Sequence, residues 1–180
     1  MRRTLFEKGA AALAVFAAAG ALSPVADAAP RPANPDWPPI PMDEELFGDN
    51  PDLVARTSGF VQSFYECLSS CPIDEQLGYL RFPTKIVLPT ATIRDAAQYR
   101  AEAERAQRDV ADPDHFVNTF KATGDEEDPL VHVTVLSSGI HRATGESFRF
   151  LTDEQLQLTW NDETNSYVIT RYQINTIAPA

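Results

Sequence analysis

The order of two hydrophobic periodicities constrains the fold of this chain more than any other feature. After residue 50 the apolar residues recur at three- and four-residue steps, as in helices, whereas from His115 onward long runs are rich in β-branched and aromatic residues. Four strands are predicted in this second part, at 116–121, 130–141, 147–160 and 167–177. Helices followed by a meander of antiparallel strands are typical of an α+β domain.

Two of these predicted strands are longer than ten residues, which is long for a globular protein. Strands of that length bend at bulges, and the segment Ser137-Ser138-Gly139 is a candidate for one. We therefore expect helices packed in a strongly curved, antiparallel sheet.

The first helix is the best-defined helix of the sequence. Asn50 can cap it, Pro51 suits its first turn, and apolar residues continue at helical spacing as far as Leu68. The aromatic residues of this stripe, Phe60 and Phe64 among them, are expected to pack in the core.

Three further elements are predicted between this helix and the strands. A short helix is expected at 73–78, followed by an extended segment at 79–88, whose prolines confine it to a sheet edge or a bulge. A third helix is expected over 94–108, with Thr92 as its cap.

The only two cysteines, Cys67 and Cys71, lie four residues apart at the end of the first helix. In an oxidising compartment such a pair predicts a disulfide, and Pro72 bends the chain away from helical geometry so that the ring can close. A metal site would need more cysteines or a nearby histidine, and a redox motif normally has two intervening residues. We expect a structural disulfide, no metal and no cofactor.

Residues 1–28 are typical of a signal peptide. A basic start with Arg2 and Arg3 precedes an apolar run at 10–25 and an A-x-A cleavage site that ends at Ala28. The run is shorter than a membrane-spanning helix requires, so a retained anchor is the weaker interpretation. The twin-arginine route is an alternative to the general secretory route. We expect a mature protein without a membrane anchor, secreted or located in the periplasm or cell envelope.

Residues 29–49 hold six of the fourteen prolines and predict an extended leader. This leader is either a linker or a segment that lies across the domain, with Trp37 among its anchors. The remaining residues, 50–180, fit a single domain.

The chain carries a net charge of −11. Such a surface repels phosphate backbones and anionic lipids, so we expect neither nucleic acid nor acidic membranes as partners. Acidity also keeps an exported protein in solution, which is the simpler interpretation.

The order and spacing of these elements, including the Phe82-Pro83 step in the extended segment and the long final strands, resemble the NTF2-like superfamily over residues 53–177. The SnoaL-like and ketosteroid-isomerase-like, cystatin-like cones are the most similar members. The resemblance implies an apolar pocket between helices and curved sheet, with an Asp, His or Tyr on its wall in the enzymes, and a sheet face that often serves for homodimerisation. No residues here match the catalytic Asp and the Tyr–Asp oxyanion hole of the isomerases.

Two residues are candidates for acid/base catalysis. His132 lies inside an apolar strand, either facing a pocket or on the solvated side. Asp153 and Glu154 interrupt a long strand, and because neighbouring side chains face opposite sides, at most one of them points inward. We take Asp153 as the second candidate, although outward charges that protect a sheet from edge pairing are the commoner explanation.

The predicted pocket wall consists of apolar and aromatic residues from the first helix and the last two strands: Phe60, Phe64, Tyr65, Leu156, Trp160 and Tyr172. Glycine-rich phosphate loops, nucleophile elbows and EF-hand spacings are absent from the sequence. The sequence thus predicts a domain that binds a small, largely apolar molecule. The alternative is a cofactor-independent isomerase, cyclase or dehydratase that uses one acid/base residue.

Overall fold

The computed structural model describes residues 50–88 and 91–179, with side chains as far as residue 174, so the predicted signal peptide and leader lie outside the described residues. The elements follow in the order α1 (Pro51–Ser70), α2 (Ile73–Leu77), β1 (Leu80–Val87), β2 (Thr92–Ile93), α3 (Ala96–Asp109), β3 (Val110–Thr123), β4 (Leu130–His141), β5 (Ser147–Asn161) and β6 (Ser166–Pro179). Helices thus precede the long strands, as the sequence predicts.

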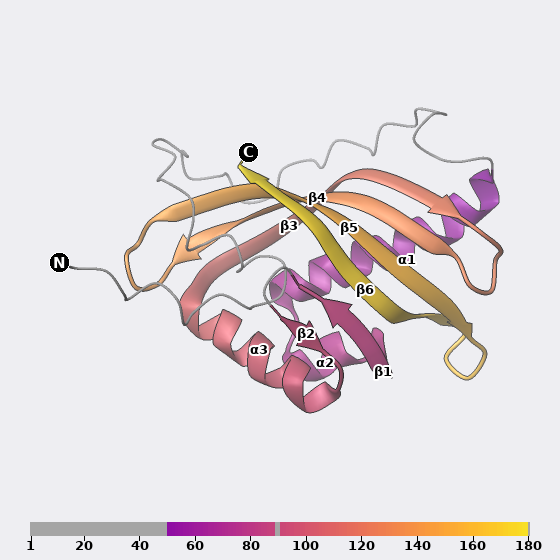
Figure 1. Ribbon diagram of the computed structural model, residues 1–180, viewed down its shortest axis with the longest axis horizontal. Helices are drawn as coiled ribbons and strands as arrows, with labels where there is room; N and C mark the ends of the chain where they lie inside the picture. Colours follow the sequence, from indigo (N-terminus) through magenta and orange to yellow (C-terminus); the bar gives the residue numbers. More distant parts are fainter. Residues whose placement is uncertain (1–49, 89–90, 180) are drawn as a thin grey trace.

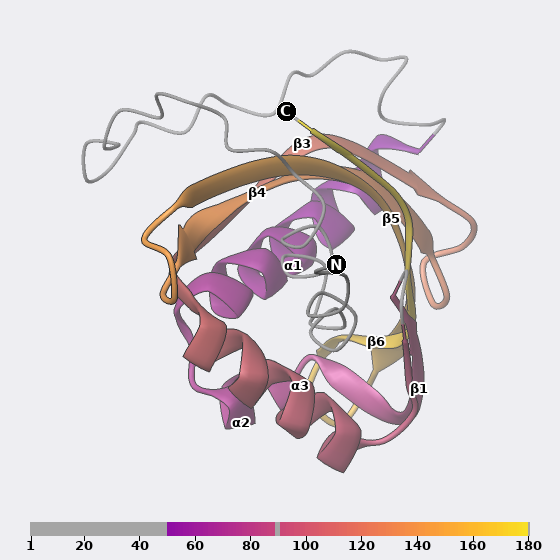
Figure 2. The same ribbon diagram turned by 60° about the vertical axis from the view of Figure 1, so that its left-hand side comes forward.

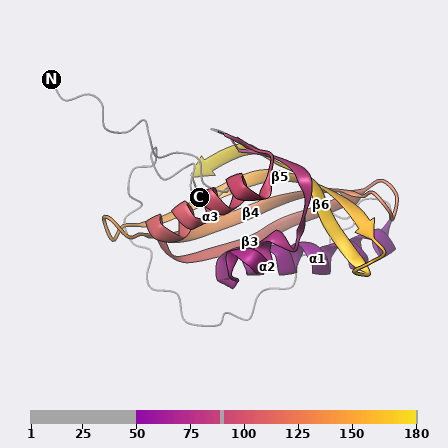
Figure 3. The same cartoon turned by 90° about the horizontal axis from the view of Figure 1, so that it is seen from below.

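The six strands form one sheet in the order β2-β1-β6-β5-β4-β3. The sheet curls around α1, while α2 and α3 lie on the open side of the curve (Figures 1 and 2). Seen from below, all three helices lie on the concave side of the sheet (Figure 3). The α+β class and the curved sheet are confirmed; one pair of strands, β1 with β6, is parallel rather than antiparallel.

The α1 helix begins as expected, because the Asn50 side chain accepts a hydrogen bond from the backbone N–H of Leu53 at 3.1 Å. Its apolar stripe, with Leu53, Val61 and Phe64 fully buried, packs into the concave face of the sheet. Long apolar stripes at helical spacing are buried in this way because hydrophobic burial stabilises the folded chain most.

The predicted cap of α3 is wrong. Asp95 caps this helix by accepting a hydrogen bond from the backbone N–H of Gln98 at 2.8 Å. Thr92 belongs instead to the two-residue strand β2, which pairs with β1. Thr and Asp are both good caps, and only the path of the chain through β2 decides between them.

Strand β3 starts six residues earlier than predicted, at Val110. The strand contains a bulge near its start: Ala111 pairs with Ile140 and Asp114 with Ser138, so two residues of β3 lie opposite Gly139. The sequence predicts a bulge at Ser137-Ser138-Gly139 on β4. The bulge lies instead on the facing strand β3, and these three residues of β4 pair with β5 in regular register.

Gly139 of β4 lies between side chains of its neighbouring strands β3 and β5. A Cβ atom at this position would come within 2.8 Å of the side chains of Val110 and Phe148. The bend of the sheet therefore needs glycine here for lack of space.

The predicted disulfide between Cys67 and Cys71 is present, with Cα atoms 4.6 Å apart. Gln76 of α2 reinforces the same corner, because its side-chain amide donates to the carbonyl of Cys71 at 3.0 Å. In turn, Tyr99 of α3 donates to the carbonyl oxygen of the Gln76 side chain at 3.0 Å. The ends of the three helices are thus joined.

Candidate functional site

On strands β3, β4 and β5, four buried polar residues interrupt the apolar concave face of the sheet. His115 on β3, Ser137 on β4, and Thr152 and Glu154 on β5 all point inward, and each is at most 4% exposed. Strand periodicity places them on this face, since each is two residues from an apolar inward neighbour such as Val117 or Val135. Buried polar groups in an apolar core need partners, so their contacts define the candidate site.

Glu154 is fully buried, and three hydroxyl groups surround its carboxylate. Tyr65 of α1 donates to Oε2 at 2.7 Å, Tyr172 of β6 donates to the same oxygen, and Thr152 donates to Oε1. Among the described residues no cation forms an ion pair with Glu154. The carboxylate is therefore stabilised by hydrogen bonds alone.

Burial raises the pKa of Glu154 above its ordinary value, although the hydrogen bonds from Thr152, Tyr172 and Tyr65 act in the opposite direction. Burial and the adjacent carboxylate also raise the pKa values of Tyr65 and Tyr172 well above the usual value. Both tyrosines thus remain protonated donors at all ordinary pH values.

We assign the tautomer of His115 from the hydrogen bonds of Ser69. Its Nδ1 lies 2.8 Å from the hydroxyl oxygen of Ser69, and that hydroxyl donates its single proton to the backbone carbonyl of Tyr65 at 3.1 Å. Since Ser69 has no second proton to donate, Nδ1 of the imidazole carries the hydrogen and donates to Ser69. The other ring nitrogen, Nε2, consequently carries a lone pair.

No described residue forms a hydrogen bond with Nε2 of His115, although this atom is buried. The hydroxyl oxygen of Ser137, which lies directly opposite His115 in the β3–β4 register, is also buried without a partner. Burial lowers the pKa of His115 to about 3. The imidazole is neutral at physiological pH and presents an unsatisfied acceptor.

His115 lines a cavity of about 320 Å³ between the C-terminal end of α1, the start of β3 and α3. Its buried wall includes Val110, Ala103 and Ala106, and its exposed rim includes Ser70 and Arg142. This volume lies in the range of small-molecule sites, which are mostly apolar with a few polar groups.

A second hollow, of about 530 Å³, lies at the opposite end of α1. Phe60, Tyr79, Trp160 and Tyr167 line it, and their rings contact one another at centroid distances of 5.1 to 6.0 Å. These rings pack chiefly against each other and against the core. We therefore interpret this hollow as the edge of the core and not as the candidate site.

The catalytic candidates from the sequence lie outside the concave face. His132 is exposed on the convex face, because Val131 and Val133 take the inward positions. Asp153 is half-buried and faces away from Glu154, its neighbour. The structure therefore brings neither residue into the cavity.

The predicted wall residues are distributed over three places. Phe64 and Leu156 belong to the fully buried core, Phe60 and Trp160 line the second hollow, and Tyr65 and Tyr172 bind Glu154. None of them lines the cavity at His115.

His115 is not among the candidates from the sequence, because the predicted strand starts one residue later, at residue 116. The two-residue spacing to Val117 would have put His115 on the inward face had the strand been extended backward. Glu154 was considered together with Asp153, and the sequence held no signal to choose between them.

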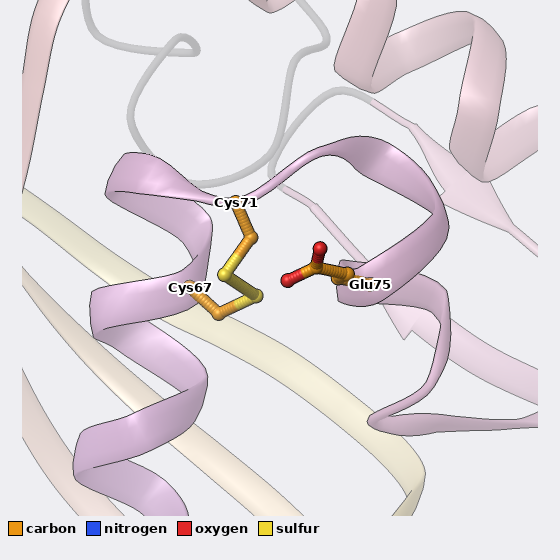
Figure 4. Close-up of side chains that lie close together, drawn as sticks. All are labelled: Cys67, Cys71 and Glu75. Atoms are coloured by element: carbon orange, nitrogen blue, oxygen red, sulfur yellow. A yellow bond between two sulfur atoms is a disulfide. The ribbon is translucent and has the colours of Figure 1, made fainter.

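Near the disulfide, the carboxylate of Glu75 points toward the two sulfur atoms (Figure 4). These three groups are close enough together to hold a metal ion, but thiolates are the cysteine species that bind metals. With the disulfide formed, neither cysteine can provide one.

The sequence matches no protein-family model and no curated protein. Solved structures match it by fold. A scytalone dehydratase-like protein from Novosphingobium aromaticivorans superposes with a TM-score of 0.63 at 9% identity, covering 71% of this chain and 87% of that one. A ketosteroid isomerase-like protein from Erwinia carotovora atroseptica gives 0.61 at 13% identity, with 72% and 100% covered.

A third match is an NTF2-like superfamily protein from Salmonella enterica serovar Typhimurium, with a TM-score of 0.60 at 11% identity, covering 71% of this chain and 92% of that one. The chain therefore has the NTF2-like fold. Of the helices in the described part of the chain, none is both long and apolar enough to span a membrane.

Proposed function

We propose that this protein binds a small, largely apolar molecule in the cavity at His115, and that a donor group of the ligand binds Nε2 of that residue. The observation that carries the proposal is that His115 lines a ligand-sized cavity while its buried Nε2 has no hydrogen-bond partner among the described residues. An unsatisfied buried acceptor costs about 1–3 kcal/mol, which a ligand donor can recover.

Binding fits the titration behaviour of His115 better than catalysis does. A general base works best when its pKa lies near the operating pH, whereas burial lowers the pKa of this imidazole to about 3. At neutral pH such a group accepts hydrogen bonds well and protons poorly.

The second candidate function is cofactor-independent acid/base catalysis, such as an isomerisation, cyclisation or dehydration. It is favoured by the position of a titratable side chain on the cavity wall and by the dehydratase-like and isomerase-like names of structures with this fold. In such a reaction Nε2 would take the proton, and Ser69 would hold the resulting imidazolium through Nδ1. This chemistry requires a bound substrate that raises the pKa of His115 toward neutrality.

Binding of 2-naphthol and of naphthalene tests the proposal, because the two probes differ only in one hydroxyl donor. We expect the wild-type protein to bind 2-naphthol about tenfold more tightly, and the His115→Phe variant to lose this preference. His132→Phe is the matched control, since this histidine is exposed on the convex face. Equal affinities in the wild type, or no binding of either probe, would contradict the proposal.

Titration of the His115 imidazole by NMR separates binding from catalysis. In the binding function the pKa of His115 stays low with 2-naphthol bound. A bound-state pKa near 6 or 7 with a candidate substrate would favour the enzyme.

Export is part of the proposal and is supported by the sequence of residues 1–28. We expect the full-length chain, expressed with a C-terminal tag, to be recovered outside the cytoplasm and cleaved after Ala28. N-terminal sequencing of the recovered protein tests this expectation, and an uncleaved cytoplasmic chain would contradict it.

A further inference from the structure

We infer that the ligand of this cavity is an amphipathic carboxylate, whose acid group binds Arg142 at the cavity mouth. This inference rests on the proposed function, since it names the chemical class of the ligand for the same cavity. It starts from the distribution of charge in the lining.

Arg142 is the one lining residue with a formal charge at neutral pH, because the other titratable residue, His115, is neutral. The chain as a whole carries a net charge of −11. A lone positive charge at the mouth of an otherwise uncharged cavity therefore runs against the sign of the whole protein. Such a charge selects an anionic ligand group over a cationic one.

The structure fixes the position of this arginine. Its Nε donates to the backbone carbonyls of Val110 at 3.0 Å and Gln107 at 3.3 Å, and its backbone N–H donates to the carbonyl of Asp109 at 2.9 Å. These bonds hold the side chain against the end of α3. A side chain fixed in this way loses little further entropy when it binds a ligand.

The terminal nitrogens of Arg142 remain available. Among the described residues, no carboxylate lies within ion-pair distance of the guanidinium, and the hydrogen bonds to protein groups use only Nε. The two terminal nitrogens form a planar fork of donors that matches the two oxygens of a carboxylate. A single guanidinium charge balances the single charge of a carboxylate.

Arg142 and His115 are two separate polar groups of the lining, the first exposed and the second buried. Arg142 follows His141, which pairs with Val110 at the start of β3. His115 lies five residues further along the same strand, beyond the bulge. A matching ligand has an apolar body, a carboxylate at one end and a hydrogen-bond donor at the other.

Four aromatic probes test this inference: naphthalene, 2-naphthol, 2-naphthoate and 6-hydroxy-2-naphthoate. Because the last probe carries both groups on one rigid body, we expect the wild-type protein to bind it at least tenfold more tightly than 2-naphthol. The Arg142→Gln variant should lose this gain, measured as the ratio of its own affinities for 6-hydroxy-2-naphthoate and 2-naphthol. The Arg142→Lys variant, which keeps the charge without the fork, should keep part of the gain.

Arg108→Gln is the matched control, because it changes the net charge equally from an exposed position on α3 outside the cavity lining. It should leave all four affinities unchanged. Because the carboxylate gain is a ratio of two affinities of the same variant, a general weakening of the cavity cancels from it, and loss of the gain is not a folding defect.

The outcomes separate this inference from the proposed function. If 2-naphthol binds but the carboxylate adds nothing, or if Arg142→Gln and Arg108→Gln behave alike, the carboxylate inference is wrong and the binding function stands. If none of the probes binds, both are wrong.

Discussion

His115 and Glu154 lie on the same inward face of the sheet, and burial shifts their pKa values in opposite directions. Burial disfavours the charged form of each, so the histidine resists protonation and the carboxyl group resists ionisation. Their surroundings differ as well. Three hydroxyls satisfy Glu154, whereas one ring nitrogen of His115 has no partner among the described residues. This difference separates a structural polar cluster from a candidate binding group.

The pH dependence of stability should report the burial of His115. The unfolded chain takes up a proton at this residue as the pH falls below about 6.5, whereas the folded chain does so only near pH 3. Above pH 6.5 both states hold His115 neutral, so this residue does not reduce the free energy of unfolding. As the pH falls from 6.5 toward 3, we expect the free energy of unfolding to decrease by about 1.4 kcal/mol per pH unit because of this residue. Urea denaturation of wild type and His115→Gln across this range measures it.

In this comparison the stability of the wild type relative to His115→Gln should decrease as the pH decreases. Glu154 acts with the opposite sign: its raised pKa gives stability at low pH that is lost as the pH rises through the folded value. Because both proteins retain Glu154, its effect cancels. Parallel pH profiles for the two proteins would mean that His115 is not buried as described.

The tyrosine hydroxyls at Glu154 should stabilise the folded state at neutral pH. Tyr65→Phe removes a donor to the buried carboxylate, and we expect it to cost about 1.5–3 kcal/mol of unfolding free energy. In a Glu154→Gln background the same substitution should cost less, because the charge is gone. The double-mutant cycle by urea denaturation measures this coupling, and additive effects would rule it out.

At the scale of elements, the C-terminal end of α1 is held by three devices. The backbone N–H of Cys71 donates to the carbonyl of Cys67 at 2.8 Å, the disulfide joins the same two residues, and Gln76 binds the carbonyl of Cys71. Ser69, the partner of His115, lies within this segment. The corner therefore positions the candidate site as well as ending the helix.

Removing the disulfide should have a modest effect on global stability. The ring closes over a separation of only four residues, and loop-closure entropy then predicts about 2 kcal/mol. We expect Cys67→Ala/Cys71→Ala to lose about that much in thermal or urea denaturation. Reduced wild-type protein is the control and should behave in the same way; a loss of folding in either would show that the bridge does more than fasten the helix end.

At the scale of the whole molecule, one apolar core joins α1 to the concave face of the sheet. Phe64 is fully buried in it, with Tyr65, Tyr79 and Tyr172 around its ring at centroid distances of 5.2 to 5.8 Å. Dimerisation through a face of the sheet, which the resemblance to the superfamily implies, stays a prediction.

Truncation of Phe64 should be costly for this reason. Phe64→Ala leaves a cavity among rings that cannot collapse onto it, and we expect a loss of about 3–5 kcal/mol. Phe60→Ala is the control, because Phe60 is only half-buried at the edge of the core and should cost less. Equal melting temperatures for Phe64→Ala and wild type would contradict the packing of α1 inside the sheet.

Local patterns in the sequence were sufficient for most elements. The cap at Asn50, the strand Leu130–His141 and the cysteine pair were predicted because each depends on residues that are neighbours in the sequence. The parallel pairing of β1 with β6 and the bulge of β3 opposite Gly139 were not, because these depend on segments far apart in the sequence. Periodicity does not report which distant strand pairs with which.

Hydrophobic periodicity in the sequence was sufficient for the α+β class and for the buried stripe of α1, because it indicates which side of an element is buried. The tertiary structure was needed to show that the valines of β4 face inward rather than His132. It was needed as well to show that Glu154 rather than Asp153 faces inward, where Tyr65 and Tyr172 meet at its carboxylate. It also brought His115, Ser69 and Arg142 to one cavity. The physical reason is that bulges set which side of a curved strand turns inward, and the sheet's curvature brings distant residues together.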